Sequence, residues 1–397
     1  MTNENSFFVQ ILSDYLNNRE TAACADLDWK EIKKYADCHQ VSGIVYRQCK
    51  SFLPREWAEE FGEKYASELF YYGNRVKLFN KIAARLSDEH IPFFVVKGFT
   101  VARLYPFPAL RTMGDCDIIV HPEDRERTHE IMLELGFSVF LKEDKDWMYD
   151  KGNLRFEIHD HLLYDEIGND KDGRRLVDHA WEYVRSTGNG TCGELEWSFH
   201  FLFLLLHLKK HLIHAGVGFR QFMDLSVVIQ NCDLDWTWLT SQLEEQGLLR
   251  FARICFTLIE RWFGISTPLE GAELDDEAYE SATNKIFESG IFGHDDESAH
   301  DVTELNAIVR KNGPRLWVRL KLIITSIFPS YRSMRFSEYY AFLDNRPWLL
   351  PLAWFYRFYR AIRYRLGGNG TKMIERSLIS DERLDKREQE LAKWGLR

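Results

Sequence analysis

The chain has 397 residues, of which 45% are hydrophobic and 28% charged, and its formal net charge is −10. This composition is typical of a globular protein, so it excludes an extensively disordered chain, and the acidic balance disfavours general nucleic-acid binding. No apolar run reaches the roughly 18 residues that cross a bilayer, and the first residues lack the basic start of a secretory signal. Seven cysteines without a CxxC pair argue against a disulfide framework or a zinc knuckle. We therefore expect a cytoplasmic protein.

Residues 1–88 predict an N-terminal helical domain. Apolar side chains recur at helical spacing near the start, and Asp28 precedes a second amphipathic stretch that begins with Trp29. Pro54 opens a third stretch, which is long and also amphipathic. The pattern indicates a helical packing module and says nothing of its chemistry.

Residues 89–166 predict an α/β core. Two short apolar runs, Phe93–Val96 and Ile118–Val120, are rich in β-branched and aromatic residues, which is typical of buried strands. Asp115 and Asp117 stand at the start of the second strand, where alternation directs both side chains to one face. Two neighbouring carboxylates repel each other and are costly to bury, and a bound cation removes both costs. A plain turn that carries two acids is the alternative.

Two further signals accompany these acids. Gly98 follows the first strand directly, and a residue without a side chain lets backbone N–H groups approach a phosphate. Lys97 and Arg111 supply positive charge nearby in the sequence. Together with the acids, they indicate a site for a phosphorylated ligand.

A third carboxylate, Glu157, lies in an alternating run of residues 154–159 that indicates a strand. Its two neighbours are apolar, so Glu157 faces away from them and shares a face with His159. Glu157 therefore has two interpretations: it belongs to one site with the aspartates, or it is a strand residue that simply faces solvent. A register slip of one residue would put Asp160 in its place.

Residues 167–265 predict loops followed by a second helical domain. Polar, glycine-rich stretches up to residue 195 indicate loops around one short helix, and a strongly apolar helix then runs to Gly216. Arg220 and Asp224 lie four residues apart on the next helix, which suits either a weak ion pair or a substrate contact by Arg220.

Three histidines share one face of the apolar helix. They indicate either simple packing or a place at the mouth of a site, where a side chain touches phosphate; a zinc site is disfavoured because no partner motif accompanies them. The candidates at the mouth are His211 with Lys209 or Lys210, and the other two histidines are His207 and His214.

The last third of the chain divides by charge. Residues 266–307 are acidic and predict a loop-rich segment, whereas residues 308–397 are basic, rich in aromatic residues and predict a helical C-terminal region. Three interpretations of the basic region stay open: packing on the rest of the chain, contact with an anionic membrane surface, or binding of a polyanion such as RNA.

The motif around the acids resembles a known family. The motif is similar to that of the nucleotidyltransferase superfamily of the DNA polymerase β type. It consists of a strand ending in Lys97-Gly98, a helix with a Tyr-Pro turn, and R-x-x-G-D-x-D from Arg111 to Asp117, followed by an apolar strand. The nearest group is a bacterial one, largely uncharacterised, whose glycine motif is written K-G. The resemblance covers residues 28–265. Phe99 stands where the superfamily usually has a second Gly or a Ser.

The resemblance implies an α+β fold, with a small mixed β-sheet core flanked by N-terminal and C-terminal helical domains, the second bordering the cleft. It also implies transfer of a nucleoside monophosphate from an NTP, ATP in the first instance, to an unidentified acceptor, with two Mg²⁺ ions as cofactors. The implied catalytic and metal-binding residues are Asp115, Asp117 and Glu157; the implied nucleotide-binding residues are Lys97, Gly98, Arg111, Lys210, His211 and Arg220.

The acceptor and the location are less defined by the sequence. A small molecule, a protein or a polysaccharide precursor are the acceptor classes we expect, and nucleic acid is not among them. The basic C-terminal region suits a peripheral position at the inner membrane face. The alternative function is a catalytically silent, NTP-binding or membrane-surface partner protein with the same fold.

Overall fold

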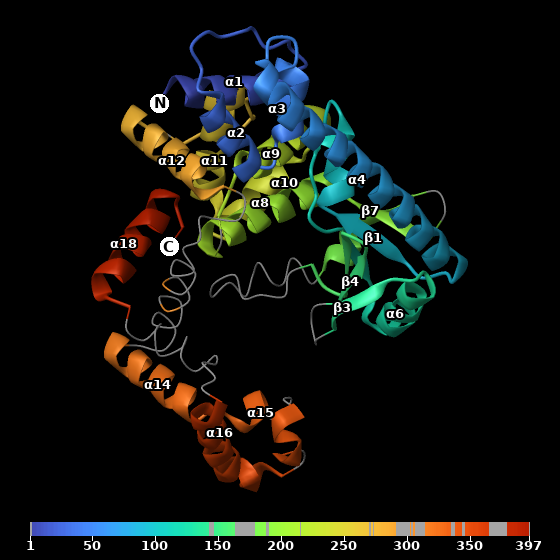
Figure 1. The fold of residues 1–397 in the computed structure, drawn as a ribbon, viewed down its shortest axis with the longest axis vertical. Coiled ribbons are helices and arrows are strands. Elements are labelled where there is room, and N and C mark those ends of the chain that lie inside the picture. Colours follow the sequence, from blue (N-terminus) through green and yellow to red (C-terminus); the bar gives the residue numbers. More distant parts are fainter. Residues whose placement is uncertain are drawn as a thin grey trace. The chain divides into compact units, whose positions relative to one another are not determined.

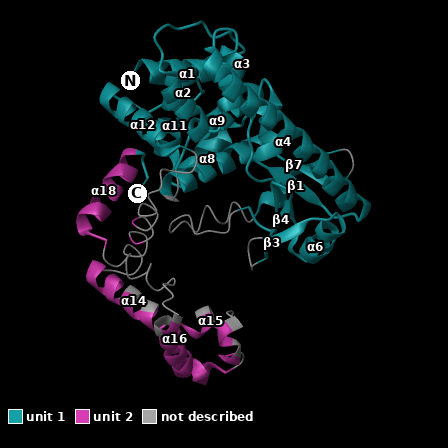
Figure 2. Cartoon of the chain, viewed as in Figure 1, with its two compact units in different colours: residues 1–294, 394–396 teal, residues 295–393, 397 magenta. Residues whose placement is uncertain are grey.

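The computed structural model divides the chain into two compact units (Figures 1 and 2). The first unit comprises Met1–His294 with Trp394–Leu396, and the second comprises Asp295–Lys393 with Arg397. The structure describes residues 2–142, 147–162, 179–187, 190–214, 216–269, 271–272, 274–290, 302, 305, 314–334, 338–343, 346–364 and 379–396.

The first unit begins with the predicted helices. Asp28 caps the second of them, because its carboxylate accepts the backbone N–H of Lys30 at 2.9 Å. The fourth helix is 34 residues long and follows Pro54, as expected. The helices are α1 (Asn3–Leu16), α2 (Trp29–Cys38), α3 (Ser42–Cys49) and α4 (Arg55–Asp88).

Seven strands form one mixed sheet in the order β3-β4-β5-β2-β1-β7-β6. Figure 1 labels β1, β3, β4 and β7 of this sheet. The pairs β2–β5 and β1–β7 are parallel, and the other neighbours are antiparallel. A mixed sheet surrounded by helices confirms the predicted α+β class. The strands are β1 (Phe93–Val96), β2 (Asp117–Val120), β3 (Ser138–Lys142), β4 (Trp147–Lys151), β5 (Leu154–His159), β6 (Val184–Ser186) and β7 (Cys192–Leu195).

The register of β2 on β5 determines which side chains meet. Asp117 lies opposite Glu157, and Ile118 lies opposite Ile158. The isoleucines are fully buried in a core cluster to which α4 and the helix α6 (Arg125–Glu134) contribute. Because strand side chains alternate, the two carboxylates leave the sheet on the opposite face from this core. Asp160 instead pairs with Arg125 at 3.0 Å.

A short connection links β1 to β2. The helix that the motif places between the two strands is α5, which spans Gly98–Ala102 and starts directly after Lys97. A 3₁₀ turn, η1 (Pro108–Leu110), follows, and a second, η2 (Pro122–Asp124), leads into α6. Gly136 ends α6 with a φ of 76°, in the left-handed region that glycine adopts readily.

The expectation of loops up to residue 195 was wrong for β6 and β7. After the turn η3 (Ala180–Tyr183), β6 and β7 form a hairpin, and β7 pairs with the outer edge of β1. A polar, glycine-rich segment lacks the apolar alternation of a strand. Pairing with the edge of the sheet nevertheless satisfies the hydrogen-bonding groups of its backbone. Gly193 permits the close packing, because a Cβ there would lie 2.2 Å from Val184 Cγ1. Residues 163–178 and 188–189 of the expected loops lie outside the described residues.

Five helices complete the described part of the first unit. The apolar helix is α8, and most of its side chains are buried among its neighbours, with Phe199, Phe201 and Leu205 nearly inaccessible. The helices are α8 (Trp197–His214), α9 (Phe219–Asn231), α10 (Trp236–Glu245), α11 (Leu249–Phe263) and α12 (Asp276–Ser289).

The second unit is a set of short helical elements around two small apolar clusters. Two of its arginines form ion pairs within the unit: Arg319 pairs with Asp381 at 2.9 Å, and Arg315 pairs with Asp385. The elements are α14 (Arg315–Ile327), α15 (Tyr331–Met334), η4 (Glu338–Leu343), η5 (Pro347–Leu349), α16 (Leu350–Tyr364) and α18 (Asp381–Lys393).

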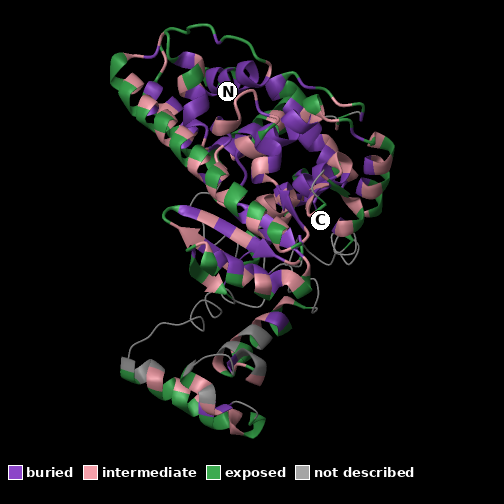
Figure 3. Ribbon diagram, turned by 90° about the vertical axis from the view of Figure 1, so that its right-hand side faces the viewer, coloured by how far each residue is buried: buried purple, intermediate pink, exposed green. Residues whose placement is uncertain are grey.

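The described helices of this unit carry many exposed residues (Figure 3), and large apolar ones are among them on α14 and α16. They share one side of each helix, at positions 316, 317, 320 and 324 of α14 and 352, 355, 356 and 359 of α16. Trp317 is 69% exposed and Phe355 is 74% exposed. Among the described residues, none of the helices combines the length and the hydropathy needed to cross a bilayer.

Candidate active site

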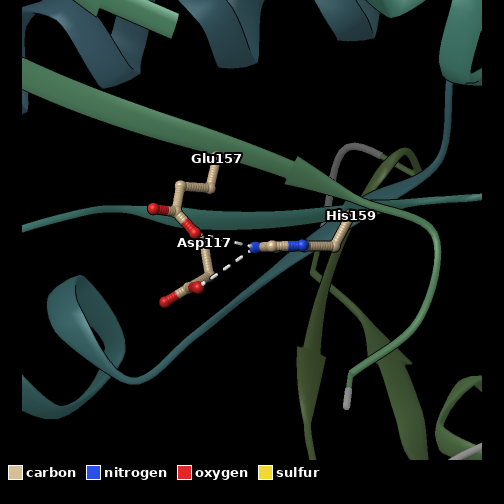
Figure 4. Close-up of side chains that lie close together, drawn as sticks. All are labelled: Asp117, Glu157 and His159. Atoms are coloured by element: carbon tan, nitrogen blue, oxygen red, sulfur yellow. Dashed lines mark ion pairs between the residues drawn. The ribbon is translucent and has the colours of Figure 1, made fainter. Parts of the chain in front are cut away.

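Asp117, Glu157 and His159 form one cluster on the polar face of the sheet (Figure 4). One possible ligand atom of each lies within 4.8 Å of the others. His159 Nε2 is 3.3 Å from Asp117 Oδ1 and 3.3 Å from Glu157 Oε2. The shared face of Glu157 and His159 agrees with the strand alternation read from the sequence, but the prediction that Asp115 and Asp117 lie in one strand was wrong, because β2 begins at Asp117.

Cationic neighbours keep this cluster ionised. Lys97 Nζ lies 3.0 Å from Asp117 Oδ2. Burial raises the pKa of Asp117, but the charges of Lys97 and His159 outweigh burial and hold that pKa below its usual range. Burial lowers the pKa of His159, whereas its contacts with Asp117 and Glu157 raise it to about 9. Asp117 is therefore in the charged form that a metal ion requires.

The donor set fits a divalent cation. Two carboxylates from adjacent strands converge on one point, and carboxylate oxygens are the protein ligands that Mg²⁺ takes. His159 Nε2 lies against both carboxylates, and its raised pKa keeps a proton on the ring, so this histidine adds a positive charge to the cluster rather than a metal ligand. The half-buried Asp115 supplies a further carboxylate at the same edge, because it lines one pocket together with Glu157.

A buried arginine holds the loop that carries Asp115. Arg75 of α4 is 4% exposed and donates to the backbone oxygens of Asp115 at 3.1 Å and Gly114 at 3.3 Å. These bonds fix the main chain of the loop from which Asp115 lines the pocket. Sequence reasoning missed Arg75, although an arginine on the buried side of an amphipathic helix is the kind of signal that could have identified it.

The pocket beside the cluster has a volume of about 450 Å³ and a polar lining. Arg155 is fixed on one wall by Asp150, with nitrogen–oxygen distances of 2.9 and 3.0 Å. The lining residues are Gly114, Asp115, Asp150, Gly152, Asn153, Arg155 and Glu157.

Lys97 has an unusual backbone. Its φ of 54° and ψ of −116° belong to a region that glycine normally occupies, and holding another residue there costs about 1–3 kcal/mol. Its N–H donates to His200 Nε2 at 3.0 Å. Gly98 packs tightly on the acidic loop, because a Cβ there would lie 3.0 Å from Met113 Sδ.

Helix α8 carries histidines that contact Lys97. His207 Nε2 lies 3.4 Å from Lys97 Nζ, and His211 Nε2 lies 3.2 Å from His207 Nε2. The sequence had drawn attention to His211 with Lys210, both half-buried, but His207 is the one that contacts Lys97. Sequence reasoning missed His200, whose spacing of seven from His207 places it on the same helix face.

Arg111 and Arg220 are bonded to protein groups. Arg111 is 7% exposed and binds Asp224 through Nε–Oδ1 at 3.1 Å and Nη2–Oδ2 at 2.7 Å, and the Tyr105 hydroxyl donates to the same carboxylate at 2.7 Å. Arg220 donates to Gln40 Oε1 at 2.7 Å and to the Thr112 backbone oxygen at 2.8 Å. Asp224 therefore pairs with Arg111 rather than with Arg220, and neither arginine joins the cluster around Asp117.

This combination defines a class of protein. A strand, a K-G turn and a second strand whose first residue faces a third carboxylate form a nucleotidyltransferase core. The model of a family described as "Uncharacterised nucleotidyltransferase" matches residues 25–264, which is more than half of the chain. The chain therefore belongs to this family and is a transferase of the nucleotidyltransferase class, which confirms the resemblance found in its motif.

Other comparisons add little. No curated protein matches the chain. The solution structure of the antibiotic-resistance factor ANT(2″)-Ia is 14% identical, with a TM-score of 0.32, and the match covers 44% of this chain and 89% of that one. The crystal structure of ANT(2″)-Ia in complex with adenylyl-2″-tobramycin is 12% identical, with a TM-score of 0.33, and the match covers 43% and 96%. Likenesses at this level carry no argument about the present chain.

Proposed function

We propose that the protein transfers a nucleoside monophosphate from an NTP to an acceptor hydroxyl in a Mg²⁺-dependent reaction that releases pyrophosphate. The observation that carries this proposal is the convergence of Asp117 and Glu157 on one face of the sheet, with Asp115 at the same edge. In this proposal Asp115, Asp117 and Glu157 hold the Mg²⁺ ions, and ATP is the donor.

Each side chain has a simple task in such a reaction. Bound Mg²⁺ would neutralise the triphosphate and the charge that develops at the α-phosphorus. Glu157 accepts the proton of the attacking hydroxyl or holds that hydroxyl in line. Lys97 supplies a fixed positive charge to the phosphates, and Gly98 lets the backbone beside them pack closely on the acidic loop. Most of the catalysis is therefore positioning and charge neutralisation.

The remaining predicted residues divide into two groups. His211 and Lys210 follow His207 on α8, and His211 contacts His207, which in turn contacts Lys97. We therefore place both residues at the phosphate end of the site. For Arg111 and Arg220 we propose a bracing role in place of a nucleotide contact, because Asp224 binds two nitrogens of Arg111, and Gln40 and Thr112 bind Nη1 of Arg220. They fix the loop that precedes the acids.

We place the acceptor in the pocket beside Glu157. Two exposed rings stand at its edge: Tyr71, whose hydroxyl accepts from Asn153 at 3.2 Å, and Phe140, whose ring lies 3.7 Å from the guanidinium of Arg155. Polar walls with aromatic rings at the rim suit a small, hydroxyl-bearing ring compound better than an aliphatic one. This supports a small molecule as the acceptor class.

The experiment that tests the proposed function is a calorimetric titration of ATP, CTP, GTP and UTP, each with Mg²⁺ and each with a chelator. Binding of at least one nucleotide that needs Mg²⁺ is the expected result, and it also names the donor. Absence of binding by all four to folded protein would overturn the proposal.

A second candidate role belongs to the second unit, where we propose contact with an anionic membrane surface. The exposed face of α16 is mostly aromatic and that of α14 combines Trp317 with Leu and Ile, a mixture that suits a bilayer interface. Neither helix contains an acidic residue, whereas each contains three basic ones. An anionic membrane surface complements the positive charge of these helices. A second copy of the chain would present the same positive face, and the two faces would repel each other.

We expect flotation with vesicles that contain phosphatidylglycerol, and none with phosphatidylcholine alone. Trp317→Glu and Phe355→Glu should abolish flotation, because a carboxylate is costly to bury among acyl chains. Phe70→Glu is the matched control, since Phe70 is an exposed aromatic residue of the first unit. Vesicle binding that persists in both variants would contradict this role, as would dimerisation through this face without vesicle binding.

A further inference from the structure

His200 is a buried histidine that contacts the backbone of Lys97 rather than any ligand-facing group. Its side chain is fully buried, and its Nε2 accepts the Lys97 N–H at 3.0 Å. A ring nitrogen that accepts a hydrogen bond has no proton, so the neutral ring has its proton on Nδ1. Burial, aided by the charges of Arg103 and Lys97, lowers the pKa of His200 to about 3, which keeps Nε2 an acceptor at neutral pH.

Two features of this contact require an explanation. His200 Nδ1 has no hydrogen-bond partner within the described part of the chain, although it is buried. Lys97 keeps a glycine-like backbone conformation although it has a long side chain. A glycine would remove that strain but would also remove the ammonium that lies 3.0 Å from Asp117 and 3.4 Å from His207. The strained backbone of Lys97 is therefore found at a residue whose ammonium group is held in a fixed position in the site.

We propose that His200 is a positioning residue, which holds the Lys97 backbone in its left-handed conformation so that the ammonium stays at the phosphate end of the site. The inference rests on the proposed function, since it makes Lys97 a ligand of the β- and γ-phosphates. Two bonds to the Lys97 backbone are seen in the described part of the chain: its N–H donates to His200, and its oxygen accepts from the Val101 N–H at 2.9 Å. The second bond belongs to the start of α5, so, among the described residues, His200 supplies the side-chain bond to the Lys97 backbone itself.

Nucleotide titrations of four variants test this role. His200→Phe keeps an aromatic ring beside Trp197 but removes the acceptor, and we expect about tenfold weaker binding of Mg·ATP with little change for AMP, because one charge-assisted contact to the outer phosphates is lost. His200→Gln, which restores an acceptor, should recover most of the affinity. In a Lys97→Ala background, adding His200→Phe should cause no further loss. Equal losses for ATP and AMP, or additive losses in the double variant, would overturn the proposal.

A second measurement needs no nucleotide. Because glycine adopts the conformation unaided, His200→Phe should lower the free energy of unfolding less in a Lys97→Gly protein than in the wild type. An equal loss in both backgrounds would contradict the positioning role. If the wild type bound no nucleotide, the proposed function would fail, and this stability cycle would still decide whether His200 holds Lys97.

Discussion

Asp117→Asn is expected to lower the affinity for Mg·NTP, and the rate of nucleotide transfer, by at least about 100-fold, since replacing even a residue that only supports a metal ligand costs about 10–100-fold. Asp117 contacts both Lys97 and His159, and its partner in the register is Glu157. The asparagine keeps the shape but removes the charge on which the cation depends. Calorimetry with Mg·ATP measures the affinity, and pyrophosphate release measures the transfer.

Asp160→Asn is the matched control for this variant. Asp160 follows β5 directly and is paired with Arg125 at 3.0 Å, outside the cluster around Asp117. The same change of chemistry there should leave metal-dependent nucleotide binding within about twofold of the wild type. Retention of metal-dependent binding and transfer by Asp117→Asn, with the fold intact, would contradict the assignment of the site.

Asp224→Ala is expected to destabilise the protein by about 3–5 kcal/mol, because it leaves a buried guanidinium without its counter-charge. Arg111 and Asp224 are 7% and 5% exposed, and two hydrogen bonds join them. Tyr105 would lose its acceptor as well. Urea denaturation, followed by circular dichroism, measures the change in the free energy of unfolding.

An exposed ion pair provides the comparison. Arg103 and Glu194 form a similar pair, but their side chains are 44% and 40% exposed. Glu194→Ala should therefore cost no more than about 1 kcal/mol. If Asp224→Ala and Glu194→Ala lowered the free energy of unfolding equally, burial would not make the Arg111–Asp224 pair more important for stability than the exposed pair.

Local pattern was enough to predict the centre of this site. Apolar runs predicted β1 and β2, and alternation within β5 predicted that Glu157 and His159 share a face. These features repeat every second residue, so a short window of sequence contains them. The roles of these residues in catalysis stay predictions until the variants are measured.

What the sequence could not predict depends on contacts between distant residues. Lys97 and His200 are 103 residues apart, and Arg111 and Asp224 are 113 apart. Nothing near either residue of a pair indicates its partner, so Arg220, four residues from Asp224, looked like the better candidate. The strands β6 and β7 were missed for the same reason, because their strand character comes from pairing with β1 rather than from their own side chains.

The position of β1 in the sheet has a consequence for synthesis. Its outer edge pairs with β7, which begins roughly a hundred residues later, so at about 5–20 residues per second the ribosome needs roughly 5–20 s to supply that partner. During this interval the nascent chain presents Phe93 and Phe94 on an unpaired strand edge, which is a template for aggregation. Slow elongation between β1 and β7 should therefore lower the yield of folded protein, and holdase chaperones should raise it.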